Sequence, residues 1–146
     1  GFVHDEASAF FGGLAGNAGL FSTARDVARV YQMLLNGGEI DGQRYLSKET
    51  CQLFTTEISK ISRRGLGFDK PDADDPKKGN CAPAAPAEVY GHTGFTGTCA
   101  WVDPMNELVY VFLSNRIYPD VTNRKLNQLH IRERIQGAIY DAMKKK

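Results

Sequence analysis

The sequence predicts an α+β fold in which an antiparallel sheet is flanked by helices. Three observations support this: helical periodicity in the first third of the chain, two neighbouring strand-like runs joined by a tight turn, and a helical pattern at the end. Helices, then a sheet, then a closing helix is an order typical of α+β domains. With 146 residues the chain is long enough to bury a core.

Two helices are expected in the first part of the chain. Thr23 is a good N-cap, and residues 24–36 place apolar side chains at helical spacing until Asn36 and two glycines end the pattern. A second, shorter helix is expected at residues 47–56, with Ser47 as its cap.

The segment between these helices and the sheet carries weaker signals. Residues 64–70 contain two glycines and predict a short strand that another backbone can approach closely. Residues 71–88 carry four prolines and several small residues, which indicate a mobile loop.

Three antiparallel strands are expected at residues 89–94, 97–104 and 108–115, the last two joined by the turn sequence DPMNE. Trp101 and Phe112 fall on these strands and are expected in the core. Residues 123–146 predict a closing helix. Its expected apolar stripe consists of Leu129, Ile131, Ile135, Ile139 and Met143.

The composition argues against several classes of function. A formal net charge of +1 gives no basic surface for nucleic acid or an anionic membrane, and no segment is long and apolar enough to span a bilayer. Cys51, Cys81 and Cys99 lack zinc-site spacing; they are three buried thiols, or one disulfide and one free thiol. We expect no metal and no cofactor.

Two histidines favour structural interpretations. His4 is followed by Asp5 and Glu6, but adjacent positions do not converge on one metal ion, so residues 4–6 are expected to form a solvated loop. His130 lies in the predicted closing helix and is expected to be a surface or packing residue.

The stretch YGHTGFTGT, residues 90–98, is the strongest candidate for chemistry. Histidine, here His92, is the residue type suited to proton transfer near neutral pH, and the glycines let a ligand lie against the strand, where backbone N–H groups can stabilise an oxyanion. The alternative is a glycine-rich inner strand that begins with an exposed histidine. The chain contains no G-x-S-x-G, dinucleotide-binding or Walker motif.

Taken together, three motifs resemble the C-terminal part of serine β-lactamase-like proteins, which include class C β-lactamases, D-alanyl-D-alanine carboxypeptidases and related esterases. The motifs are STARDVARV, HTGFTG and the WVDP…LVYVFLSNR pair, and the resemblance covers nearly the whole chain. It implies that residues 1–146 form the C-terminal part of one such domain, with the remainder of the domain as its partner.

The resemblance also implies the roles of individual residues. His92, Thr93 and Gly94 occupy the K-T-G or H-T-G position of the family, where the first residue aids proton transfer and carboxylate binding. The backbone N–H of Phe95 matches an oxyanion-hole donor. The other expected substrate contacts are Gly94, Thr96, Asn115 and Asp120. Asp120 stands where class C enzymes commonly carry Asn, and its charge would repel a substrate carboxylate.

The family's nucleophile motif, S-x-x-K, and its Tyr-x-Asn element are absent from the chain. Both lie upstream of this region in the family order, so the chain alone is expected to be inactive. The resemblance implies acyl-enzyme hydrolysis of a β-lactam, a D-alanyl peptide or an ester in the periplasm or cell envelope. The alternative is a non-catalytic domain that binds cell-wall peptides.

Overall fold

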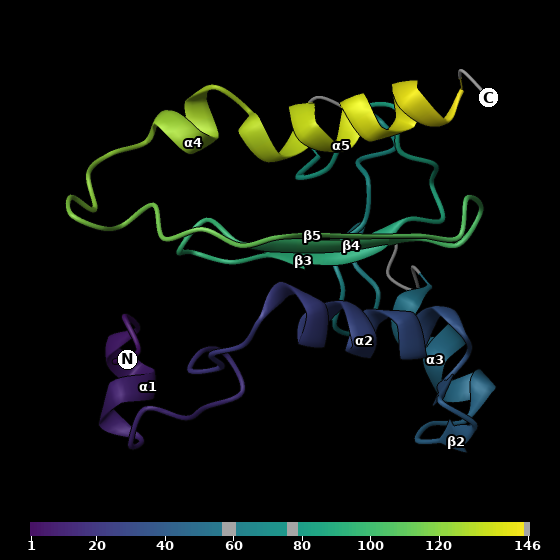
Figure 1. Ribbon diagram of the computed structural model, residues 1–146, viewed down its shortest axis with the longest axis horizontal. Helices are drawn as coiled ribbons and strands as arrows, with labels where there is room; N and C mark the ends of the chain where they lie inside the picture. Colours follow the sequence, from purple (N-terminus) through teal and green to yellow (C-terminus); the bar gives the residue numbers. More distant parts are fainter. Residues whose placement is uncertain (57–60, 76–78, 145–146) are drawn as a thin grey trace.

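A three-stranded antiparallel sheet forms the middle layer of the molecule, which confirms the predicted α+β class (Figure 1). This computed structural model describes residues 1–56, 61–75 and 79–144. The strands are β3 (Tyr90–Thr93), β4 (Cys99–Asp103) and β5 (Leu108–Phe112), in the order β3-β4-β5. Their register aligns Gly91 with Trp101 and Trp101 with Tyr110.

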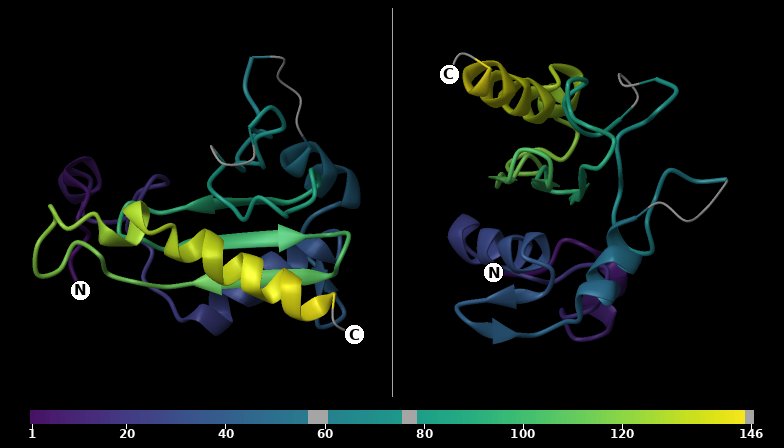
Figure 2. Two further views of the ribbon diagram at one scale, coloured as in Figure 1. Left: turned by 90° about the horizontal axis from the view of Figure 1, so that it is seen from above. Right: turned by 90° about the vertical axis from the view of Figure 1, so that its right-hand side faces the viewer.

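Helices cover both faces of the sheet. α5 (Ile131–Met143) runs along one face, while α2 (Ala24–Leu35) lies against the other with α3 (Lys48–Thr55) beside it (Figure 2). The two predicted N-caps are confirmed: the hydroxyl of Thr23 accepts the N–H of Asp26 at 3.2 Å, and that of Ser47 accepts the N–H of Thr50 at 3.1 Å.

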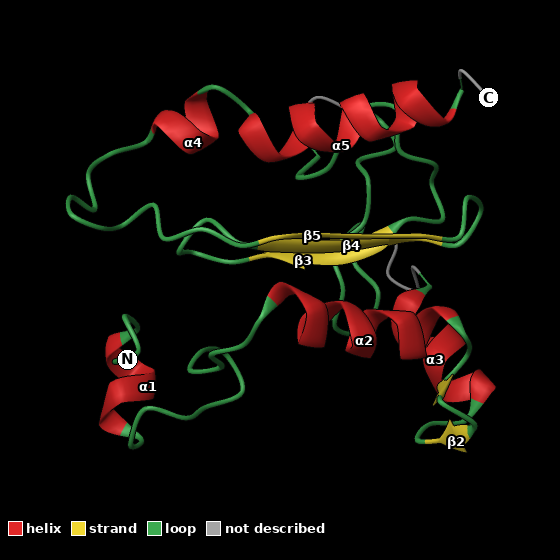
Figure 3. Cartoon of the chain, in the orientation of Figure 1, coloured by secondary structure: helices red, strands yellow, loops and turns green. Residues whose placement is uncertain are grey.

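Two elements were not anticipated (Figure 3). One is the short helix α1 (Glu6–Phe10), so the expectation of a loop at residues 4–6 is wrong for Glu6. The carboxylate of Asp5 accepts the N–H of Ser8 at 2.7 Å and caps that helix. The other is a hairpin of β1 (Glu39–Ile40) and β2 (Gln43–Arg44).

The predicted strand at residues 64–70 is wrong. The backbone bends there, because the N–H of Gly65 donates to the carbonyl of Phe68 at 3.0 Å. Within this segment, only Asp69 pairs with the sheet through its backbone, exchanging two hydrogen bonds with Gly91. In the predicted loop, residues 71–75 and 79–88 contain no helix or strand, and residues 76–78 lie outside the described residues.

The prediction of a single closing helix is also wrong. The chain instead forms two helices, α4 (Lys125–Gln128) and α5, with a break at His130. His130 is exposed and adopts a φ of 49°, and its N–H donates to the carbonyl of Asn127 instead of continuing the helix.

The buried face of α5 differs from the predicted apolar stripe. Arg132, Gln136 and Tyr140 are its buried residues, whereas Leu129, Ile135 and Met143 are exposed. Each buried polar side chain has a partner: Gln136 accepts the N–H of Ala82, Tyr140 donates to Asp103, and Arg132 donates to the carbonyl of Thr98. These hydrogen bonds compensate the burial of Gln136 and Tyr140, whereas Nε of Arg132 is buried with no hydrogen-bond partner among the described residues.

The core lies between the sheet and α5. Its buried members are Cys81, Val89, Cys99, Trp101 and Tyr110, and Phe112 packs against them while partly buried. Gly91 permits this packing, because a Cβ there would meet the indole of Trp101 at 2.6 Å. The three cysteines are free and buried, as the first of the two alternatives predicted. Burial raises the pKa of the Cys81 thiol to about 12 and that of Cys99 to about 11.

Within the described residues, no helix has the length and apolar character needed to cross a membrane. No group of three or more His, Cys, Asp or Glu side chains in that part of the chain is arranged to hold a metal ion.

Candidate active-site strand

The candidate site lies at the end of β3, which is an edge strand of the sheet. β4 pairs with one side of β3, and on the other side the two hydrogen bonds with Asp69 engage only Gly91. His92 follows Gly91 and is exposed, while Thr93 and Gly94 are half-buried. An edge strand of this kind leaves backbone groups available to a ligand.

The imidazole of His92 has two polar contacts that define its tautomer. Its Nε2 lies 3.2 Å from Nη1 of Arg64, and its Nδ1 lies 2.7 Å from the carbonyl oxygen of Thr93. A guanidinium only donates hydrogen bonds and a carbonyl only accepts them. These two contacts match an imidazole that accepts from Arg64 at Nε2 and donates to Thr93 from Nδ1.

An ion pair between partly exposed Arg63 and buried Asp69 holds the segment that carries Arg64. The guanidinium of Arg63 donates to both carboxylate oxygens of Asp69, at 2.8 and 3.1 Å, and Asn80 donates to the same group at 2.8 Å. Burial raises the pKa of Asp69, but these hydrogen bonds and the charge of Arg63 outweigh it and leave the pKa below its ordinary value. Asp69 thus stays ionised and anchors the segment at β3.

A tight turn follows β3 and presents the candidate oxyanion donor. The N–H of Gly94 donates to the carbonyl of Thr98 at 2.8 Å, and the N–H of Gly97 donates to the carbonyl of Gly94 at 2.9 Å. Gly97 adopts a φ of 98°, which favours glycine. The N–H of Phe95 makes no hydrogen bond to any described residue, so this donor remains available.

The remaining predicted substrate contacts surround this turn. The carbonyl of Thr96 accepts the N–H of Arg116 at 2.9 Å, and Asn115 is exposed. The carboxylate of exposed Asp120 accepts hydrogen bonds from the hydroxyl and N–H of Thr122, at 2.7 and 2.8 Å, which lower its pKa.

Arg116 brings the segment that contains Asp120 to the turn. Its guanidinium donates to the carbonyl of Phe95 at 2.7 Å and to that of Val121 at 3.4 Å. Neither Arg64 nor Arg116 was predicted as a site residue. Arg64 lies outside the three family motifs, whereas Arg116 ends the LVYVFLSNR motif and was given no role there.

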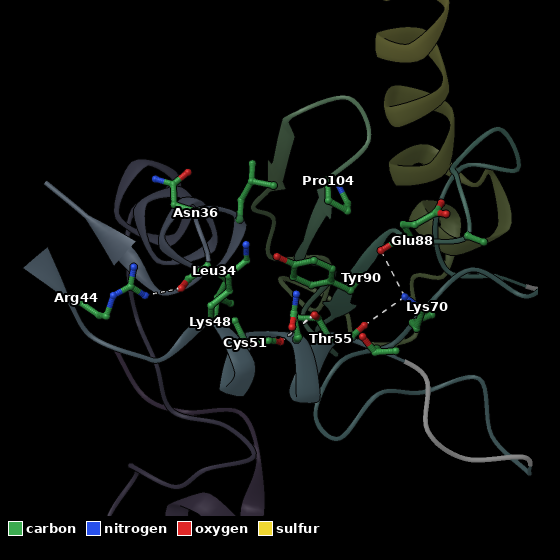
Figure 4. A pocket seen from close by; sticks show the side chains of 15 residues that line it. Leu34, Asn36, Arg44, Lys48, Cys51, Thr55, Lys70, Glu88, Tyr90 and Pro104 are labelled. Atoms are coloured by element: carbon green, nitrogen blue, oxygen red, sulfur yellow. Dashed lines mark hydrogen bonds between the residues drawn. The ribbon is translucent and has the colours of Figure 1, made fainter. Parts of the chain in front are cut away.

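A pocket in the described part of the chain lies elsewhere, between α2, α3 and the start of β3 (Figure 4). Its volume is about 860 Å³, and none of the predicted site residues lines it. Tyr90 faces it, and the ammonium of Lys70 closes one wall by donating to the carbonyls of Thr55 and Glu88, at 3.2 and 3.4 Å. The pocket is therefore distinct from the end of β3.

Comparison with known proteins places this geometry in a family. The β-lactamase family model matches residues 2–133. Proteins named "Putative D-alanyl-D-alanine carboxypeptidase" from Escherichia coli O157:H7, Escherichia coli strain K12 and Salmonella agona are 37%, 36% and 36% identical to the chain over 128 residues. Each match covers 87% of the chain and 29% of the relative.

The chain thus spans less than a third of the length of these curated relatives. The family match includes the three-stranded sheet, the turn at Phe95 and the helices α2 and α3, and it ends at residue 133, at the start of α5. On these grounds the chain belongs to the β-lactamase family.

Proposed function

We propose that the protein containing this chain is a serine hydrolase that cleaves D-alanyl peptides through an acyl-enzyme. The chain supplies the His92–Gly94 strand and the Phe95 N–H, and a serine outside the chain supplies the nucleophile, since the chain has no S-x-x-K pattern. The relatives carry the name of a D-alanyl-D-alanine carboxypeptidase, which favours a peptide over a β-lactam or an ester.

The available N–H of Phe95 is the observation that carries this proposal. When a serine oxygen attacks the peptide carbonyl, the carbonyl oxygen becomes an oxyanion that needs prearranged donors. The C–N bond then breaks, the amine leaves with a proton, and water hydrolyses the acyl-enzyme. The Phe95 N–H is suited to the oxyanion because it is unpaired within the described residues and lies in a hydrogen-bonded turn.

The charges around the turn indicate where a substrate carboxylate binds. Arg64 lies beside His92 and is about half exposed, so it offers a cation with accessible donors. Asp120 carries a negative charge on the other segment next to the turn. A terminal D-alanine carboxylate is therefore expected to bind at Arg64, away from Asp120. Because D-alanyl-D-alanine ends cell-wall peptides, we place this activity in the cell envelope.

The test of the activity uses the full-length protein. It is treated with a fluorescent penicillin and a fluorophosphonate, labelling is read by intact mass, and release of D-alanine from a D-alanyl-D-alanine peptide is measured. We expect labelling of one serine outside this chain, and loss of both labelling and D-alanine release when that serine is replaced by alanine. Peptide binding without labelling or release would contradict the enzyme and support the peptide-binding alternative.

A charge test then examines the carboxylate site. Arg64→Gln in the full-length protein is expected to raise KM for a D-alanyl peptide about tenfold or more, because a charge-assisted hydrogen bond is lost. KM for the corresponding peptide amide, which lacks the terminal charge, should change little. Arg134→Gln, an exposed arginine on α5, is the matched control. Equal KM changes for the two substrates would exclude Arg64 from carboxylate binding.

A further inference from the structure

We infer that Arg116 is a positioning residue that fixes the orientation of the Phe95 peptide and joins it to the segment containing Asp120. This inference rests on the proposed function, because it assigns Arg116 a part in presenting the oxyanion donor. It concerns a side chain that does not itself touch the reacting atoms.

Three consecutive peptide units of the turn are held by hydrogen bonds to their carbonyls. Gly94 accepts the N–H of Gly97 at 2.9 Å, Phe95 accepts Nε of Arg116 at 2.7 Å, and Thr96 accepts the N–H of Arg116 at 2.9 Å. The hydroxyl of Ser114 adds a bond to Thr96 at 3.3 Å. Because each peptide unit is planar, fixing a carbonyl also fixes the N–H that follows it.

This arrangement determines which N–H groups of the turn are already hydrogen-bonded and which stay available to a ligand. Arg116 binds the carbonyl side of the turn through its backbone and its side chain, and neither bond uses the N–H of Phe95. The Gly94 carbonyl and the Phe95 N–H share one peptide plane, and Arg116 holds the two planes that follow it. The N–H of Phe95 is thus oriented by hydrogen bonds to the carbonyls of the turn, and none of these bonds uses the N–H itself.

Ring contacts restrain the same residue. The guanidinium carbon of Arg116 lies 4.5 Å from the centroid of the Phe95 ring, which is a cation–π contact. The imidazole of His4 stacks on that ring at 5.4 Å with an interplanar angle of 10°. Phe95 is 64% exposed, so these two contacts and the backbone bonds, not burial, hold it.

Arg116 also connects the turn to a second segment. Its Nη1 donates to the carbonyl of Val121 at 3.4 Å, next to Asp120. Packing is close on the turn side as well, since a Cβ on Gly97 would lie 3.3 Å from the Cβ of Arg116. A rigid planar fork can reach two carbonyls while stacking on a ring, whereas the single ammonium of lysine cannot.

Arg116→Lys and Arg116→Gln in the full-length protein test this role, with Arg134→Lys on α5 as the matched control. We expect kcat for a D-alanyl peptide and the rate of acylation by penicillin to fall about 10- to 100-fold in both variants, because small displacements of a catalytic donor carry costs of this size. KM should stay within about twofold. A boronic acid that forms a tetrahedral adduct on the serine should bind more weakly by the same factor as the loss in kcat.

A second readout does not depend on activity. Amide hydrogen exchange at Gly97 is expected to accelerate about tenfold or more in Arg116→Lys, while exchange in the turn after β4 stays unchanged. Unchanged exchange at Gly97, or unchanged kcat in Arg116→Lys, would overturn the positioning role. A wild-type protein that no probe acylates would instead overturn the proposed function, and the exchange data would still decide whether Arg116 holds the turn.

Discussion

The turn between β4 and β5 and the turn between β3 and β4 close opposite ends of one sheet, and different residues hold them. The β4–β5 turn is held largely by its own first residue: the carboxylate of Asp103 accepts the N–H groups of Met105 and Asn106, at 2.9 and 3.1 Å, and the side-chain amide of Asn106. The β3–β4 turn has two backbone hydrogen bonds of its own and is also held by Arg116 and Ser114, which follow β5.

The difference separates a structural turn from a turn that can serve a site. In the β4–β5 turn, the N–H groups of Met105 and Asn106 donate to Asp103 and are therefore not available to a ligand. In the β3–β4 turn, the external residues bind carbonyls, and the N–H of Phe95 stays unpaired within the described residues. In this turn, residues from outside add to the two internal backbone hydrogen bonds without using the N–H of Phe95.

Removing the Asp103 carboxylate, which supports the β4–β5 turn, should have the largest effect on stability. Asp103→Ala is expected to lower the free energy of unfolding by about 3 kcal/mol, because hydrogen bonds to a buried carboxylate contribute roughly 1.5–3 kcal/mol each. Asp103 is 2% exposed, and it also accepts the hydroxyl of Tyr140 at 2.8 Å. Urea unfolding measures the change.

Asp103→Asn is the control variant, because asparagine keeps the shape of aspartate but not its charge. It keeps one oxygen that can accept the two turn N–H groups, so about half of the loss is expected. If Asp103→Ala and Asp103→Asn were equally destabilised, the carboxylate charge rather than the local turn bonds would hold this end of the sheet.

The same difference explains what could be predicted from the sequence. The sequence DPMNE identified the β4–β5 turn because its stabilising groups lie within four residues of each other. HTGFTG identified the position of β3 and its turn. Arg64 was missed because it lies outside the family motifs, and Arg116, which ends the LVYVFLSNR motif, was given no role because only the folded chain brings it to Phe95.

Errors in the helices have a related cause. The apolar stripe predicted for the closing helix assumed that burial follows hydrophobicity. The face of α5 that packs on the sheet instead buries Gln136 and Tyr140, because each finds a hydrogen-bond partner on another segment. Periodicity located the helix but not those partners, which lie 54 and 37 residues away.

A smaller loss of stability is expected when a methyl group is added at Gly97, where it would disturb the contact of the β3–β4 turn with Ser114. Gly97→Ala should lower the free energy of unfolding by about 1–3 kcal/mol, since alanine is strained at a φ of 98°. The new Cβ would also meet the hydroxyl of Ser114. Urea unfolding measures the stability, and penicillin acylation of the full-length protein should slow in parallel.

Gly137→Ala is the matched control for this substitution. Gly137 lies within α5, and a Cβ added there would have open space for 4 Å around it, so alanine should raise stability by roughly 0.5–1 kcal/mol. A Gly97→Ala variant as stable as wild type, with normal acylation, would show that the turn has room to adjust and that its geometry is not tightly held.

The smallest effect is expected at the end of the β4–β5 turn, where a substitution should stabilise the protein. Glu107 is exposed and adopts a φ of 50°, a conformation that costs a residue with a side chain about 1–2 kcal/mol relative to glycine. Glu107→Gly removes this strain but makes the unfolded chain more flexible, so a net gain of about 0.5 kcal/mol is expected in urea unfolding. Met105→Gly in the same turn has no positive φ to relieve, and it should lose a similar amount. Because neither change touches the β3–β4 turn, acylation of the full-length protein should match wild type in both, and a change in its rate would mean that the two ends of the sheet are coupled.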